Sequence, residues 1–173
     1  MAYRKDQQRV QTGIVFGVTA SITFIAAVYY FLPVALPGQD GAGARLAYAL
    51  RWDLLLALTL AVAIPIVGVN RFRGENIMGE RHVADPVLEI NLRFLQNTLE
   101  QVVLAYAAHL TLAILLPAAY LRLIPALAIW FVIARVAFWI GYHRHPLSRS
   151  FGFADTILPT QASLLVCGLL AVF

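Results

Sequence analysis

The stretch from Arg93 to Glu100 holds residue types that could bind a ligand inside a membrane protein. Arg93, Asn97 and Glu100 are spaced by four and then three residues, so they share one face of a helix. A carboxylate that faces lipid costs several kcal/mol, so this face should point at other protein or at a water-filled cleft. Two interpretations stay open from this stretch alone: a polar clamp that holds helices together, or part of a ligand site.

A second polar face is predicted near the end of a later apolar segment. Arg135, Phe138 and Tyr142 fall on one face of that helix, and Arg149 follows seven residues after Tyr142. Guanidinium groups pair with carboxylates in a bidentate geometry, and a nearby cation favours the thiolate form of a thiol. If both polar faces reach the same side of the membrane, they suit an anionic, peptide-like ligand.

The composition places these two faces in a membrane protein. Of the 173 residues, 61% are hydrophobic and 13% are charged, whereas soluble domains carry about 25% charged residues. The net charge of +4 is first a signal of membrane topology, and we expect no nucleic-acid partner. A single cysteine, Cys167, excludes an intramolecular disulfide.

The apolar segments predict an all-α, polytopic membrane protein with five transmembrane helices. A helix needs about 20 apolar residues to cross the hydrocarbon core. Five segments meet this requirement, and they cover residues 13–34, 46–69, 87–116, 121–142 and 153–173.

The basic residues predict the orientation of these helices. On one predicted side lie ten of the 13 basic residues: Arg4, Lys5, Arg9, Arg71, Arg73, Arg81, Arg93, Arg135, Arg144 and Arg149. The other side has Arg45, Arg51 and Arg122. The positive-inside rule therefore predicts a cytosolic N-terminus and a C-terminus that lies outside or in a lumen.

The histidines and a pair of glycines have simpler interpretations. We interpret His109 as an interhelical or outer-leaflet hydrogen-bonding residue and not as a catalytic one. No carboxylate or cysteine is spaced to share a metal with the loop histidines, so we predict no metal site at His82, His143 and His145. Gly13 and Gly17 form a GxxxG pattern, which is typical of helix packing in membranes.

In its two polar motifs the sequence resembles the MAPEG proteins, the membrane-associated proteins in eicosanoid and glutathione metabolism. The first motif, R-x-x-x-N-x-x-E, is formed by Arg93, Asn97 and Glu100. The second is R-x-x-(Y/F)-x-x-G-Y with an arginine seven residues later, formed by Arg135, Phe138, Gly141, Tyr142 and Arg149. The resemblance implies a four-helix bundle over residues 46–173 that assembles as a homotrimer. Residues 1–45 would then be a cytosolic N-terminus with an additional helix.

The resemblance also implies a ligand and a role for each site residue. Glutathione would be the cofactor, bound between neighbouring subunits, and Arg149 would be the catalytic residue that stabilises its thiolate. The remaining predicted contacts to glutathione are Arg93, Asn97, Glu100, Arg135, Phe138, Tyr142 and, as a further anion contact, Arg73. The implied function is a glutathione S-transferase or peroxidase that acts on lipophilic electrophiles, which arrive through the membrane.

The sequence departs from the family pattern in two ways, and these keep an alternative function open. Phe138 stands where several family enzymes have a tyrosine, so the site lacks a hydroxyl group. The sequence RFLQNTLEQ and the additional N-terminal helix resemble the mattrin-like branch of the family. The alternative is therefore a non-catalytic membrane protein that binds lipids or other membrane proteins. A channel or transporter is disfavoured, because the polar residues cluster at one end of the helices.

Overall fold

A computed structural model describes residues 2–37, 41–74, 77–79 and 85–172, and all regular structure in these ranges is helical. Five helices are long and apolar enough to cross a membrane: α1 (Ala2–Phe31), α2 (Ala42–Arg73), α3 (Pro86–Leu115), α4 (Leu123–Arg144) and α5 (Ser150–Val172). Two short 3-10 turns, η1 (Ala118–Tyr120) and η2 (Pro146–Arg149), join the last three helices. The predicted all-α class with five membrane-spanning helices is confirmed.

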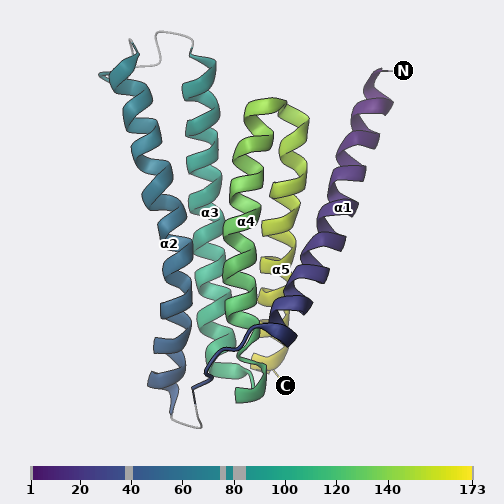
Figure 1. Ribbon diagram of the computed structural model, residues 1–173, viewed down its shortest axis with the longest axis vertical. Coiled ribbons are helices and arrows are strands. Elements are labelled where there is room, and N and C mark those ends of the chain that lie inside the picture. The colour runs from purple at the N-terminus through teal and green to yellow at the C-terminus, as the bar shows by residue number, and fades with distance from the viewer. Residues whose placement is uncertain (1, 38–40, 75–76, 80–84, 173) are drawn as a thin grey trace.

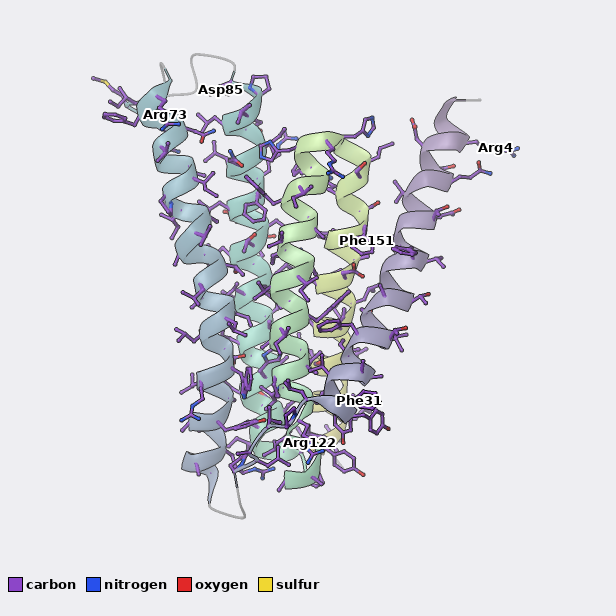
Figure 2. The ribbon with its side chains drawn as sticks, in the orientation of Figure 1. Arg4, Phe31, Arg73, Asp85, Arg122 and Phe151 are labelled. Carbon is purple, nitrogen blue, oxygen red and sulfur yellow. The ribbon has the colours of Figure 1, made fainter. Side chains whose placement is uncertain are left out.

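Helices α2 to α5 stand side by side as a bundle, and α1 lies obliquely against α5 and α4 (Figure 1). The start of α1, the end of α2, the start of α3 and the α4–α5 connection lie at one end of the molecule. The end of α5 lies at the opposite end, beside the end of α1. Arg4 and Arg73 therefore lie at one end and Arg122 at the other (Figure 2). Arg81 and His82 lie outside the described residues.

Helices α1, α2 and α5 begin before the apolar segments from which they were predicted, whereas α3 agrees with its predicted segment within one residue. Helix α1 begins at Ala2 and not near residue 13, because residues 2–12 contain no glycine or proline and favour helix despite their polarity. Helix α3 begins where Asp85 caps it: the Asp85 Oδ1 accepts from the backbone N–H groups of Val87 and Leu88, at 2.9 and 3.0 Å. Pro86 occupies the first helical position, where its lack of a backbone N–H costs no hydrogen bond.

Close packing of α4 against α5 depends on a glycine. A Cβ atom at Gly152 would collide with the backbone of Phe138 and Ala134 on α4. Small residues of this kind let two membrane helices approach closely, since lipid offers no hydrophobic force to drive them together. This approach fixes the start of α5 beside the polar face of α4.

Helix α1 packs on α5 through the predicted glycine pair. A Cβ atom at Gly13 would lie 2.8 Å from the Ser150 Oγ, and one at Gly17 would lie 2.5 Å from the Asp155 Oδ1. Both glycines therefore face α5, and α1 forms an additional wall on that side of the bundle.

Candidate functional site

A cavity of about 430 Å³ opens between α3, α4, η2, α5 and α1. The two polar motifs meet there, because the start of α3 and the end of α4 lie at the same end of the bundle (Figure 1). Five of the eight predicted site residues line this cavity: Arg93, Asn97, Phe138, Tyr142 and Arg149.

Tyr142 is the side chain around which the two arginines of the cavity gather. Its ring is buried, and its hydroxyl oxygen accepts a hydrogen bond of 3.4 Å from the Arg93 Nη1. The guanidinium carbon of Arg149 lies 4.6 Å from the centre of the same ring, a cation–π contact. Arg93 also donates from Nε to the Glu89 Oε1, at 2.8 Å, one turn earlier on α3. The cavity therefore has two guanidinium groups beside one tyrosine.

Arg135 lies behind the cavity and does not line it. Its side chain is buried, and Nη1 donates to the Asn97 Oδ1 at 2.8 Å. Nη2 donates to the Gly152 carbonyl at 3.1 Å and contacts the Thr156 hydroxyl. Its guanidinium carbon lies 4.7 Å from the centre of the Phe138 ring. Arg135 therefore ties α4 to α3 and α5 and holds Asn97 in the cavity wall.

Glu100 and Arg73 lie outside this cavity. Glu100 is exposed on α3 and accepts a 3.0 Å hydrogen bond from the Gln96 Nε2. Glu100 does not line the cavity, although Asn97, three residues or about 4.5 Å earlier on the helix, does. Arg73 is the exposed last residue of α2. Within one copy of the chain neither residue reaches the other predicted ligands.

An apolar wall completes the cavity. It consists of Val10 from α1, Leu147 from η2 and Phe153 from α5, and Ser150 also lines the cavity. The arrangement can therefore bind a molecule that has an anionic group for the arginines and an apolar part for this wall. Among the residues that the structure describes, no three His, Cys, Asp or Glu side chains gather as metal ligands would.

Sequence reasoning missed several buried polar residues. Asn91 accepts from the Trp139 Nε1 at 2.8 Å and from the His143 Nε2 at 3.0 Å, and so ties α3 to the end of α4. Asp53 and Asp155 are buried within membrane-spanning helices. A carboxylate inside an apolar span was the signal that could have found the two aspartates.

The interhelical hydrogen bond predicted for His109 is confirmed. Its ring Nδ1 lies 2.5 Å from the Asp53 Oδ1, so it joins α3 to α2.

Comparison with known proteins decides the family. The model of the MAPEG family matches residues 41–169, which include α2 to α4 and most of α5. The chain belongs to the MAPEG family. Helix α1 lies outside the segment that the family model matches.

Curated relatives match a larger part of the chain. Mouse (Mus musculus) Transmembrane protein 79 is 26% identical over 157 residues, which are 87% of this chain and 39% of the relative. The protein of the same name from cattle (Bos taurus) is 27% identical over 139 residues, 79% of this chain and 34% of the relative. The chain thus spans less than half the length of these relatives. No solved structure matches it significantly. Transmembrane protein 79 is mattrin, itself a MAPEG member, so the predicted resemblance is confirmed.

Proposed function

We propose that this protein is a non-catalytic MAPEG membrane protein whose cavity binds a lipid with an anionic head group. The observation that carries the proposal is the lining of the cavity. The lining combines two cations, Arg93 and Arg149, with the apolar side chains of Val10, Leu147 and Phe153. A lipid has both parts, and it can enter from the bilayer. The similarity to Transmembrane protein 79 supports the non-catalytic part of this proposal.

Few polar groups near the cavity are free to take part in catalysis, and this favours binding over catalysis. Phe138 contributes a ring without a hydroxyl group. The guanidinium of Arg135 is committed to Asn97, Gly152 and Thr156, and the amide oxygen of Asn97 is committed in turn. Fewer groups are therefore available to orient a tripeptide than the two motifs suggest.

A second candidate function is a glutathione S-transferase or peroxidase, with glutathione as the cofactor. Arg149 favours it, because this exposed cation lies beside Tyr142 in the cavity wall. There it could stabilise a thiolate and so raise the fraction of glutathione present as nucleophile. A lipophilic electrophile would reach the thiolate along the apolar wall.

Either function is compatible with assembly as a homotrimer, which we also propose. Glu100 is exposed on the outer face of α3 within a membrane-spanning helix. A carboxylate exposed to lipid costs several kcal/mol, whereas a neighbouring copy could cover it with protein. In such an assembly Glu100 and Arg73 could contact a ligand held by the neighbour.

A turnover assay separates the two functions. Purified protein in detergent receives glutathione and a chromogenic aryl halide. The lipid-binding proposal predicts that wild type and Arg149→Ala have the same background rate. Turnover that Arg149→Ala abolishes, and that Arg144→Ala at the exposed end of α4 retains, would overturn the proposal in favour of the transferase.

A further inference from the structure

A second polar centre lies inside the bundle, away from the cavity described above. Asp53 on α2, His109 on α3 and Asp155 on α5 are 0%, 2% and 1% exposed. Asp53 and His109 are paired through Oδ1 and Nδ1 at 2.5 Å. Ionisable side chains buried within a membrane protein are rare and require partners.

Both aspartates of this centre have unpaired carboxylate oxygens within the described part of the chain: Asp53 has one, Oδ2, and Asp155 has two. The Trp130 Nε1 on α4 donates to the backbone oxygen of Asp155, at 3.0 Å, and not to its carboxylate. On the other side Gly17 of α1 lies so close that a Cβ there would be 2.5 Å from the Asp155 Oδ1. A buried carboxylate without any partner is costly, so a further group must satisfy it.

A small cavity adjoins both Asp155 and His109. It has a volume of about 10 Å³ and lies between α3, α4 and α5, with the side chains of Thr156 and Thr160 also in its lining. A cavity of this size holds about one water molecule, provided that two to four polar groups surround it. Because Asp53 engages the Nδ1 of His109, the Nε2 is the ring nitrogen left for such a water.

We propose that this cavity binds one water molecule, which bridges the His109 Nε2 and the Asp155 carboxylate. Asp53, His109, the water and Asp155 then form one hydrogen-bonded unit that joins α2, α3 and α5. Thr156, which also lines the cavity, contacts the Arg135 guanidinium, so Arg135 and its partner Asn97 lie close to this unit without being part of it.

Water fits this site better than a cation. Hard cations such as Ca²⁺ and Mg²⁺ take about six or more oxygen ligands. Here the His109 ring lines the cavity, and the Arg135 guanidinium contacts Thr156 in its lining. The volume also excludes any organic molecule, because ligand pockets are about 300 Å³ or larger.

A double-mutant cycle tests whether His109 and Asp155 share a partner. The melting temperature in detergent is measured for His109→Gln, Asp155→Asn and the double variant. We expect each single substitution to lower the melting temperature, and the double variant to lose clearly less than the sum of the two. The matched control pairs His109→Gln with Asn91→Ala, about 27 Å away along α3, and should be additive. Additive losses for His109 and Asp155 would overturn the proposal.

Direct observation keeps the proposal testable if the variants do not fold. A high-resolution experimental structure of the wild type should show density for one water between His109 and Asp155. An empty cavity would overturn the proposal. So would a melting temperature that rises with sodium chloride but not with choline chloride in the wild type and loses this response in Asp155→Asn, since that result would place a cation at this carboxylate.

Discussion

The Arg135 side chain joins α4 to α3 and α5 by hydrogen bonds, although it was predicted to contact a ligand. It shares a helical face with Tyr142, which lines the cavity, yet its own guanidinium points to α3 and α5. The motif fixes which residues share a face, but not how deep each one lies. Depth depends on the close approach of α5 at Gly152, which the spacing of residues on α4 does not reveal.

Replacing Arg135 should therefore weaken the fold. Arg135→Met leaves the Asn97 and Gly152 oxygens without this donor, although relief from burying a cation offsets part of the loss. We expect a net loss of about 2 kcal/mol in the free energy of unfolding. Arg135→Lys should not restore it, because an ammonium group lacks the planar fork that reaches two helices.

Denaturation in mixed SDS micelles measures this effect. Arg144→Met, an exposed arginine on the same helix, is the matched control and should change little. Equal stability of Arg135→Met and wild type would show that the hydrogen bonds of Arg135 contribute nothing to the fold.

The two buried aspartates mark the limit of sequence reasoning at the residue scale. Arg93, Asn97 and Tyr142 belong to motifs, so their spacing pointed to a shared site. Asp53 and Asp155 belong to no such motif, and the His109 ring that pairs with Asp53 lies on another helix. Only the high free energy of a carboxylate within a membrane-spanning segment could have identified them from the sequence.

At the scale of helices, hydrophobic length predicted the existence and order of all five. Their ends were less predictable, because caps and polar extensions determine them. The start of α3 was predicted within one residue, because Pro86 marks it in the sequence. The start of α1 was not, because the polar residues after Ala2 continue the helix beyond its apolar part. The close contact between α4 and α5 was not predicted, since a single glycine among apolar residues has no distinctive pattern.

Two glycines on α5 test how that contact is made. Gly152→Ala places a methyl group against the backbone of α4 and should lower the free energy of unfolding by about 1 to 3 kcal/mol. Gly168→Ala meets open space on the same helix, so it should be neutral or stabilise by up to about 1 kcal/mol. Chemical denaturation of both variants compares them directly, and equal effects would contradict the close approach of α4 and α5.

At the scale of the whole molecule, the cavity is assembled from segments far apart in the chain. Both polar motifs were predicted on the same side of the membrane, and the bundle has them at one end (Figure 1). The contribution of α1 was not predicted: Val10 enters the cavity wall only because α1 crosses obliquely over α5. Crossing angles depend on side-chain packing between helices, which one sequence does not reveal.

The orientation of the molecule in the membrane is a further prediction at this scale. The excess of arginine at the α2–α3 and α4–α5 end should face the cytosol. In a Cys167→Ala background, Ser148→Cys in η2 should react with an impermeant maleimide only after cells are permeabilised. Ala119→Cys in η1 should react in intact cells. The reverse pattern of labelling would contradict the predicted topology.

The most direct test of the proposed function is lipid retention in native mass spectrometry. Protein extracted from mixed phosphatidylglycerol and phosphatidylcholine should retain the anionic lipid preferentially. Arg93→Ala with Arg149→Ala should abolish this preference, while Arg144→Ala should keep it. Equal retention of both lipids by the wild type, or a preference unchanged in the double variant, would contradict an anionic-lipid site at these arginines.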